Sequence, residues 1–305
     1  MKIKAVFNRD GGTFKTTDMD DYCARATEAF ARAGHDIECR VVAGAEIVDA
    51  LEKAAQEPGI EAILAGGGDG TISAAAGIAW KAGLPLGVIP AGTMNLFARA
   101  LGLPLDIWAV LDVLAKAKIR AVDIATVGDR PFVHQFSAGL HARMVRLRDK
   151  MEFASRLGKM RASVQAALSV IGRPPRFEVA LDIDHDGQKE RSRVSAVSVS
   201  NNSFGNNPLM FAENPAGGHL GVYLADALKP SGALKLAIDI IRGRLKENEA
   251  VHAKTANSVT LEFSRSRHTL AVVDGELLHL PPKLEISIHP GELKVLAPEP
   301  QDPVD

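Results

Sequence analysis

One short segment of the chain reads Gly66-Gly67-Gly68-Asp69-Gly70-Thr71 and lies between an apolar run and a helical run. Consecutive glycines let backbone N–H groups approach an anion closely, and a following helix adds donors and a positive dipole end. Asp69 is unexpected in such a site, because a carboxylate repels phosphate unless Mg²⁺ or water lies between them. A tight strand-to-helix turn with a capping aspartate explains the residues equally well. The segment therefore indicates either a phosphate-binding loop or an ordinary turn.

Two other polar loops also follow apolar runs. One is the segment Gly92-Thr93-Met94-Asn95, in which Thr93 could bind a phosphate oxygen and Asn95 could fix the loop or a base. A threonine that caps a helix is the alternative for Thr93. The other loop consists of Asn8, Arg9, Asp10, Gly11 and Gly12. Taken alone, these residues would be interpreted as an ordinary turn. The sequence contains neither G-x-x-x-x-G-K-[ST] nor G-x-G-x-x-G, which excludes a Walker A loop and a dinucleotide fingerprint.

A third feature with possible chemistry lies far along the chain, where Asp274-Gly275-Glu276 follows a short apolar run. Two carboxylates around a glycine are common in tight turns. Phosphoryl transfer to an alcohol needs a carboxylate that accepts the hydroxyl proton, and this part of the chain offers no comparably placed acid. Asp274 and Glu276 are therefore our candidates for catalysis.

The elements that must position these loops alternate in the first part of the chain. Strands are predicted at residues 3–7, 37–42, 60–65 and 86–89, and helices at 18–33, 46–55, 72–81 and 94–101. Thr17, with Asp20 three residues later, is typical of a capped helix start. Such alternation predicts a doubly wound parallel sheet, in which ligands bind beyond the carboxyl ends of the strands. The three loops are therefore expected at one edge of this sheet.

The pattern changes near residue 121 to short alternating runs with turns at Asp129-Arg130 and Asp186-Gly187. The runs are 121–127, 132–136, 177–183, 194–200, 220–224, 259–263, 270–273 and 284–289. They predict a mainly antiparallel, β-sandwich-like domain, interrupted by one long helical segment over residues 140–171. We place the domains at residues 1–122 and 123–297, followed by a loose tail at 298–305.

Composition narrows the class of protein. The chain has 305 residues, 46% of them hydrophobic, and a net charge of -1, which gives no indication of nucleic-acid binding. The only two cysteines, Cys23 and Cys39, suit neither a disulfide framework nor a zinc site, and they favour a reducing compartment. We find no signal peptide and no apolar run long enough to span a bilayer. A cytoplasmic protein is expected, with peripheral contact at the inner face of the membrane left open.

Together, these segments resemble a known family, the bacterial diacylglycerol kinase-like lipid kinases, to which sphingosine and ceramide kinases are related. The matching segments, in order, are Gly67-Gly68-Asp69-Gly70-Thr71, Gly92-Thr93-x-Asn95-x-Phe97-Ala98-Arg99-x-Leu101-Gly102-x-Pro104, Ser200-Asn201-Asn202, Leu220-Gly221-Val222-Tyr223-Leu224 and Val273-Asp274-Gly275-Glu276. The resemblance spans nearly the whole chain. The combination is specific, whereas Gly-Gly-Asp-Gly-Thr alone also occurs in NAD kinases.

The resemblance implies an α/β nucleotide-binding domain and a β-sandwich-like lipid domain, with the active site in the cleft between them. It implies ATP and Mg²⁺ as cofactors and a lipid as substrate. It further implies that Asp274, with Glu276 beside it, is the general base. The residues expected to contact ATP are Asn8, Arg9, Asp10, Gly11, Gly12, Gly66, Gly67, Gly68, Asp69, Gly70, Thr71, Ser73, Thr93 and Asn95.

The sequence departs from the family at three places. Related enzymes often carry an acidic pair where this chain has Ala216 and Gly217, so the family's structural Mg²⁺ site is expected to be missing or altered. Many members have Asp at the position of Leu96, and Asn-Glu at Ser73-Ala74. The metal ligands therefore stay unassigned.

A basic stretch could contact a membrane. Its members are Arg143, Arg146, Arg148, Lys150, Arg156, Lys159 and Arg161, interspersed with Met144, Leu147, Met151, Phe153 and Leu157. A basic amphipathic helix can rest on anionic lipid, whereas a solvated helix face is the commoner origin of this pattern. The lipid substrates that the resemblance implies favour peripheral contact with a membrane surface. The sequence also admits a homodimer.

Three functions thus remain open. The first is an ATP-dependent lipid kinase acting on diacylglycerol or a related lipid. The second is an NAD kinase-like small-molecule kinase, which the segment from Asn95 to Arg99 disfavours. The third is a catalytically weakened homologue that binds nucleotide or lipid, which the missing acidic pair suggests.

Overall fold

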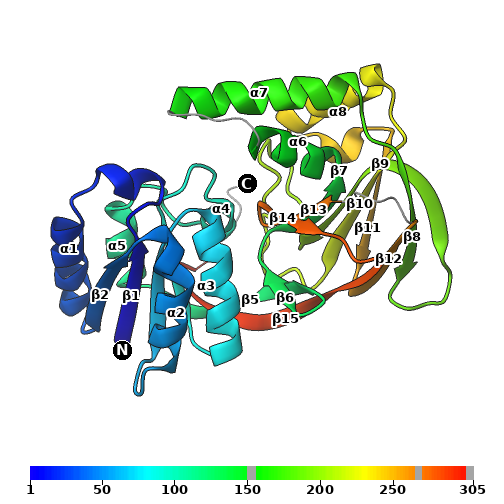
Figure 1. Ribbon diagram of the computed structural model, residues 1–305. Helices are drawn as coiled ribbons and strands as arrows, with labels where there is room; N and C mark the ends of the chain where they lie inside the picture. Colours follow the sequence, from blue (N-terminus) through cyan, green and yellow to red (C-terminus); the bar gives the residue numbers. More distant parts are fainter. Residues whose placement is uncertain (150–155, 265–269, 300–305) are drawn as a thin grey trace, which may run out of the picture. The chain divides into compact units, whose positions relative to one another are not determined.

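The computed structural model describes residues 1–149, 156–264 and 270–299, and the chain divides into two compact units (Figure 1). Unit 1 comprises Met1–Ile124 together with the C-terminal segment that starts at Pro290, and unit 2 comprises Ala125–His289. From the sequence we placed the two domains at residues 1–122 and 123–297, and that division did not include the return of the chain to unit 1 at Pro290. The first residue of the tail that we expected to be loose makes a contact, because Arg120 Nη1 donates to the Pro298 carbonyl at 2.7 Å. Residues 300–305 lie outside the described residues.

Unit 1 contains the predicted parallel sheet, in the order β4-β3-β1-β2. The strands are β1 (Lys2–Asn8), β2 (Asp36–Val42), β3 (Ala62–Gly67) and β4 (Leu86–Pro90). The end of the last strand, β15 (Lys283–Ala297), adds to β4 in parallel through Val295 and Leu86. The run Ala5-Val6-Phe7 is fully buried, as expected for a strand covered on both faces.

The helices of unit 1 follow the predicted alternation. They are α1 (Met19–Arg32), α2 (Ile47–Gln56), α3 (Asp69–Ala82), α4 (Leu96–Ala100) and α5 (Ala109–Leu114), with short 3₁₀ turns at Gly12–Thr16 and Gly44–Glu46. The predicted capping of α1 by Thr17 is wrong by one residue. Asp18 accepts the N–H groups of Asp20 and Asp21, whereas the Thr17 hydroxyl donates to the Thr13 carbonyl.

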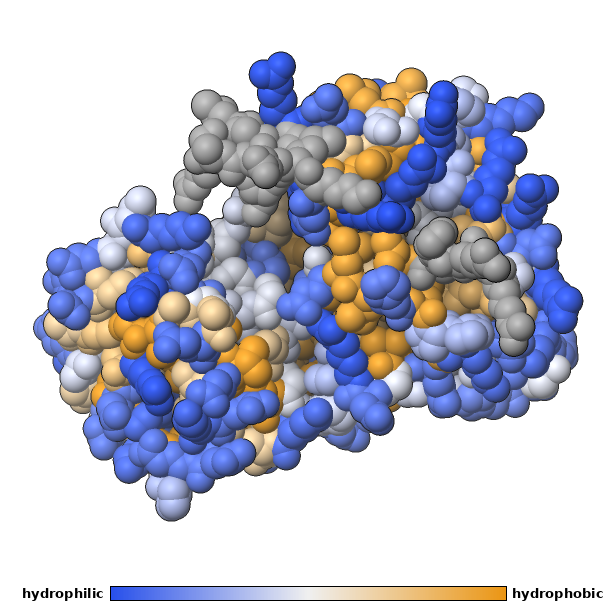
Figure 2. Space-filling view, viewed as in Figure 1, coloured by the Kyte–Doolittle hydropathy of each residue, from blue (hydrophilic) through white to orange (hydrophobic). Residues whose placement is uncertain are grey.

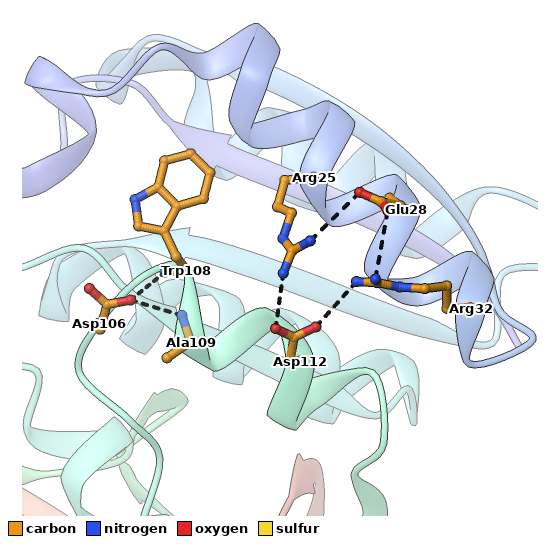
Figure 3. Close-up of polar contacts among 7 residues, drawn as sticks. All are labelled: Arg25, Glu28, Arg32, Asp106, Trp108, Ala109 and Asp112. Carbon is orange, nitrogen blue, oxygen red and sulfur yellow. Dashed lines mark hydrogen bonds and ion pairs between the residues drawn. The ribbon is translucent and has the colours of Figure 1, made fainter.

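Helix α5 packs near α1 through a surface network of charges (Figure 3). Asp112 on α5 lies 3.2 Å from Arg25 Nη2 and 3.5 Å from Arg32 Nη2, and both arginines also approach Glu28. Pairs this exposed contribute little to stability. Tyr22 contributes more, because its buried hydroxyl donates to the Ile107 carbonyl at 2.8 Å.

The start of α5 gives a prediction about stability. Asp106 Oδ1 accepts the N–H groups of Trp108 at 3.0 Å and Ala109 at 2.8 Å (Figure 3). Asp106→Ala leaves these donors without the carboxylate, so we expect the free energy of unfolding to fall by about 1 kcal/mol. Urea denaturation measures the change, with Glu52→Ala on the exposed face of α2 as the control. An unchanged midpoint for Asp106→Ala would show that the cap is energetically silent.

Unit 2 is the predicted mainly antiparallel β domain. Its ladder runs β14-β13-β7-β9-β8-β12-β15, with β10 between β9 and β11, and with β5 pairing β6 and β15. Strand β5 (Lys118–Val127) begins in unit 1 and ends in unit 2. The other strands are β6 (Arg130–Phe132), β7 (Gln135–Gly139), β8 (Phe177–Ile183), β9 (Glu190–Asn201), β10 (Leu220–Asp226), β11 (Val251–Ala256), β12 (Ser258–Phe263), β13 (Leu270–Val273) and β14 (Glu276–His279). Alternate apolar residues of these strands form one core that includes Phe136, Val199 and Ile286.

Helices in unit 2 lie beside this sheet. The predicted helical segment 140–171 is two helices, α6 (Leu140–Asp149) and α7 (Arg156–Gly172), with residues 150–155 outside the described part. A further helix, α8 (Pro230–Ile241), and a 3₁₀ turn at Leu245–Glu247 complete the unit. Among the described residues, no helix combines the length and the apolar character required to cross a bilayer.

Candidate functional site

The three predicted loops of unit 1 lie together at the carboxyl edge of its sheet. Because β1, β3 and β4 are parallel neighbours, their carboxyl ends meet at this edge. Thr13 N–H donates to the Ala91 carbonyl at 2.8 Å, and Ala91 N–H donates to the Gly67 carbonyl at 3.0 Å. Asn8 Nδ2 donates to Thr71 Oγ1 at 3.1 Å. The expectation that the loops share an edge is confirmed by these bonds.

Two glycines allow the loops to approach each other this closely. A Cβ on Gly92 would lie 2.8 Å from the Cα of Gly68, and one on Gly12 would collide with the Ala91 carbonyl oxygen. Gly12 also has a φ of +20°, which L side chains rarely adopt. These glycines are therefore required by the contact between loops, whether or not an anion binds.

Asp69 has a role that the sequence left open. Its Oδ1 accepts the Leu96 N–H at 2.7 Å, and its Oδ2 accepts the Asn95 N–H at 3.1 Å. The carboxylate thus ties the loop after β3 to the start of α4. Two charge-assisted bonds to backbone N–H groups account for an acidic residue in a glycine loop without an intervening metal ion.

Asn95 organises the loop after β4. It adopts a left-handed φ of 51°, its Oδ1 accepts the Gly92 N–H at 2.8 Å, and its Nδ2 donates to the carbonyls of Pro90 and Gly92. Its side chain is buried and committed to its own loop. Thr93 is exposed at the tip of the same loop, where its hydroxyl is accessible.

The N-terminus of α3 supplies anion-binding chemistry at this edge. Gly68 is the N-cap, and Asp69, Gly70 and Thr71 form the first turn. N–H groups of a first turn have no intrahelical acceptor, and a glycine cap provides no side chain to cover them. The described arrangement therefore suits the phosphates of a nucleotide. Ser73 is half-buried on the next turn of the helix.

The loop before this helix is held by its own polar residues. Asn8 Oδ1 accepts the Asp10 N–H at 3.0 Å, and Asp10 Oδ2 accepts the Gly44 N–H at 2.7 Å. Arg9 is exposed beside them, and Gly11 N–H donates to the Asn8 carbonyl at 3.0 Å. These bonds give the loop a fixed shape, and Arg9 is an exposed cation within it.

Magnesium fits this edge only as an ion carried by the nucleotide. Among the described residues, no group of three or more His, Cys, Asp or Glu could hold a metal ion. Mg²⁺ at phosphates keeps several waters and needs only one or two protein carboxylates, and Asp10, which uses Oδ2 for the Gly44 N–H, could supply one.

The family's structural metal site does not fit the residues in unit 2. Ala216 and Gly217 offer no carboxylate, and a Cβ on Gly217 would lie 2.6 Å from Asn202 Oδ1. Asn202 is 1% exposed, and neither its Oδ1 nor its Nδ2 has a hydrogen-bond partner among the described residues. The residues at these positions therefore supply no charge for a divalent cation.

The two catalytic candidates lie in unit 2, on the hairpin between β13 and β14. Val273 pairs with Glu276, so Asp274 and Gly275 form the two-residue turn, with φ values of 45° and 90°. Asp274 Oδ1 accepts the N–H groups of His134 and Gln135 at 3.0 and 2.9 Å, and Oδ2 accepts the Val133 N–H at 2.9 Å. The tight-turn interpretation is thus correct, and the carboxylate is also anchored by three consecutive amides.

Glu276 differs from Asp274 in its surroundings. Its side chain is 60% exposed and forms an ion pair with Arg130 at the start of β6. Asp274 is held in a fixed position by backbone amides and Glu276 is not, so Asp274 stays our first candidate for the base.

Sequence reasoning missed the segment that anchors Asp274. Residues 133–134 connect β6 to β7. Gln135, the first residue of β7, is buried beside Ser198 on β9, whose hydroxyl donates to Gln135 Oε1 at 3.4 Å. Nothing in the sequence marks Val133 or His134 as partners of an aspartate 140 residues later. The link depends on the pairing of β7 with β13, which is a tertiary contact.

A half-buried histidine on α6 gives a pH-dependent prediction. Ser137 Oγ lies 2.6 Å from His141 Nδ1, and removal of its ring from water lowers the pKa of His141 to about 4, helped by the charges of His134 and Arg148. Because the unfolded pKa is about 6.5, the unfolded state binds more protons below that value. We expect stability to be complete above about pH 6.5 and to fall as the pH drops toward 4.

The measurement is thermal unfolding between pH 4.5 and pH 7.5. His141→Gln should flatten the dependence on pH, whatever its effect on absolute stability. His279→Gln, at an exposed position, is the control. An identical slope for wild type and His141→Gln would contradict the assignment.

Two family models match successive parts of the chain, the first in the N-terminal part and the second in the C-terminal part. A model described as the diacylglycerol kinase catalytic domain matches residues 2–127. A model described as the YegS C-terminal NAD kinase beta sandwich-like domain matches residues 134–297, which is more than half of the chain.

Individual relatives agree with these models. An uncharacterized protein of Synechocystis sp. is 28% identical over 83% of this chain, which covers 59% of that protein. A diacylglycerol kinase of Staphylococcus saprophyticus is 25% identical, over 71% of this chain and 72% of its own. A solved structure, of a diacylglycerol kinase from Bacillus anthracis str. Sterne, has a TM-score of 0.71 at 18% identity and covers 97% of this chain and 96% of that chain, which shows the shared fold.

Proposed function

Because the chain belongs to the diacylglycerol kinase-like family of lipid kinases, we propose that it transfers the γ-phosphoryl group of ATP to a lipid hydroxyl, with diacylglycerol or a related lipid as acceptor. The observation that carries the proposal is the junction of three loops around the uncapped N-terminus of α3. Both carboxylate oxygens of Asp69 in this turn accept backbone N–H groups, which offset its negative charge, so the site can accept phosphate. We further propose that the protein works in the cytoplasm.

The proposed roles follow from the contacts of each residue. The first-turn amides of α3 bind phosphate oxygens, and the loops beginning at Asn8 and Gly92 hold that turn in place. Asp274 accepts the proton of the lipid hydroxyl as the new bond to phosphorus forms. Mg²⁺ that arrives with the nucleotide would neutralise the charge on the phosphates.

One assay separates this function from the alternatives. Purified protein is incubated with γ-labelled ATP and Mg²⁺, and with diacylglycerol, sphingosine, ceramide or NAD presented separately. Label in a lipid supports the proposal, and the lipid that is labelled fastest identifies the acceptor. Label in NAD alone would refute it and would favour the NAD kinase-like alternative. ATP binding without transfer to any acceptor would favour a binding protein.

A further inference from the structure

Helix α8 carries apolar side chains on two opposite faces. Ala233 and Leu236 are buried on one face, whereas Leu234, Ile238 and Ile241 are 49%, 39% and 70% exposed. The spacing of the exposed residues, at i, i+4 and i+7, places them in one stripe. A helix of a soluble protein normally has a polar outer face, so this stripe needs an explanation.

Helix α7 repeats the arrangement. Ala166 and Val170 are buried, whereas Val164 and Leu168 are 60% and 62% exposed, one turn apart. Arg161 is exposed one turn before Val164 on the same side of the helix. The described part of α7 thus presents an aliphatic stripe with a cation at its edge.

The two stripes belong to neighbouring helices. Helices α7 and α8 contact each other, and Ile171 of α7 packs with Ala233 and Leu236 of α8. Ile171 lies three residues after Leu168, on the same side of α7 as Val164 and Leu168, so the stripe of α7 ends against α8. The stripe of α8 lies away from Ala233 and Leu236, and both stripes are exposed. Figure 2 shows hydrophobic residues at the top of the view, over the segment where Figure 1 labels these helices.

The charge around the stripes is positive. Helix α7 contains three basic residues and no acidic ones. Asp239 within α8, and Glu247 and Glu249 after it, are each engaged, by Asn248, Arg244 and Lys235 respectively. Basic residues that are exposed without such a bond in the described structure are Arg161, Lys229, Arg242 and Lys246.

We propose that the stripes of α7 and α8, defined by Val164, Leu168, Leu234, Ile238 and Ile241, form a surface that docks on an anionic phospholipid bilayer. The aliphatic side chains insert at the boundary of the headgroups, and the basic residues beside them contact lipid phosphates. Two copies of this surface facing each other would place like charges together, which disfavours a dimer through it. The proposal rests on the proposed function, because a lipid kinase must reach an acceptor in a bilayer.

The experiment measures binding of the full chain to vesicles by cosedimentation. Vesicles contain phosphatidylcholine alone, or phosphatidylcholine with 30% phosphatidylglycerol, at low and high salt. The test variant is Leu168→Gln/Ile241→Gln, at positions exposed enough that folding should not change. The matched control is Val48→Gln/Ile119→Gln, which removes two exposed aliphatic side chains from unit 1.

We expect wild type and control to bind the anionic vesicles and to bind neutral vesicles weakly. The test variant should bind at least about tenfold more weakly, because two large apolar side chains no longer leave water. Equal binding of test and control variants would overturn the proposal. A wild-type dimer that the test variant dissociates, with vesicle binding unchanged, would assign the stripes to self-association and would also overturn it.

A second readout separates this surface from the proposed activity. Dioctanoylglycerol presented in solution should be phosphorylated equally by wild type and the test variant, whereas long-chain diacylglycerol in anionic vesicles should be phosphorylated more slowly by the variant. If wild type phosphorylates neither acceptor, the proposed function fails, while the cosedimentation result still decides whether the surface binds lipid.

Discussion

Asp274→Asn is expected to lower the turnover of lipid phosphorylation by about 10²- to 10⁴-fold, because an amide cannot accept the hydroxyl proton. ATP binding should be retained, since the nucleotide contacts that we propose belong to unit 1. Turnover is measured with saturating ATP and diacylglycerol, and ATP affinity by calorimetry. Full activity in Asp274→Asn would refute the assignment of the base.

The three backbone amides on Asp274 complicate this variant and must be controlled. Asn can keep the bonds from His134 and Gln135 to Oδ1, but its amide nitrogen would face the Val133 N–H, so some stability is lost. Asp184 is a matched control, because it has a φ of 51° and its Oδ1 accepts the N–H groups of Asn257 and Ser258. Asp184→Asn should therefore cost similar stability without loss of turnover.

Comparison of the two aspartates with Glu276 completes the test. Glu276→Gln breaks an exposed pair with Arg130 and should change turnover far less than Asp274→Asn. If Asp184→Asn and Asp274→Asn lower turnover equally, the loss reflects folding of unit 2. If Glu276→Gln alone abolishes turnover, the base is Glu276.

The fold was predictable where local patterns dictate it. Alternating strands and helices of residues 3–101 predicted the parallel sheet of unit 1, and the Asp-Gly dipeptide predicted the turn at Asp274. Helix α8 was missed because apolar side chains on both faces obscure the period on which a helix prediction depends. The addition of β15 to β4 joins segments 209 residues apart, Leu86 and Val295, and no local pattern encodes such a pairing.

The candidate site was likewise predictable only where local sequence patterns dictate it. Glycine loops after apolar runs were visible in the sequence, and their common edge followed from parallel pairing. The partners of individual side chains were not visible. Asp69 could be interpreted as a metal ligand or a cap until its contacts with Asn95 and Leu96 were known, because those contacts join two loops across a sheet.

Asp69→Ala is the second substitution for which we expect a large effect. It removes both acceptors for the N–H groups of Asn95 and Leu96, and these half-buried donors then lose their charged partner. Stability should fall by about 1–3 kcal/mol, and the loop from Gly92 to Asn95 should lose its fixed position beside Gly68. We therefore expect ATP affinity to fall by about tenfold or more, as the pre-organisation of the phosphate site is lost.

The matched control for this variant is Asp106→Ala, which also removes a carboxylate that accepts two backbone N–H groups in unit 1. Both variants should unfold more easily, but only Asp69→Ala should bind ATP more weakly in calorimetry at a temperature where both are folded. Asp69→Asn should be intermediate, because its single oxygen can keep one of the two bonds. Equal ATP affinity in Asp69→Ala and Asp106→Ala would show that the loop after β4 does not shape a nucleotide site. In that case the glycines at this edge would be required only for the close contact between the loops. Gly12 and Gly92 already show this requirement, because a Cβ at either position would clash with a neighbouring loop.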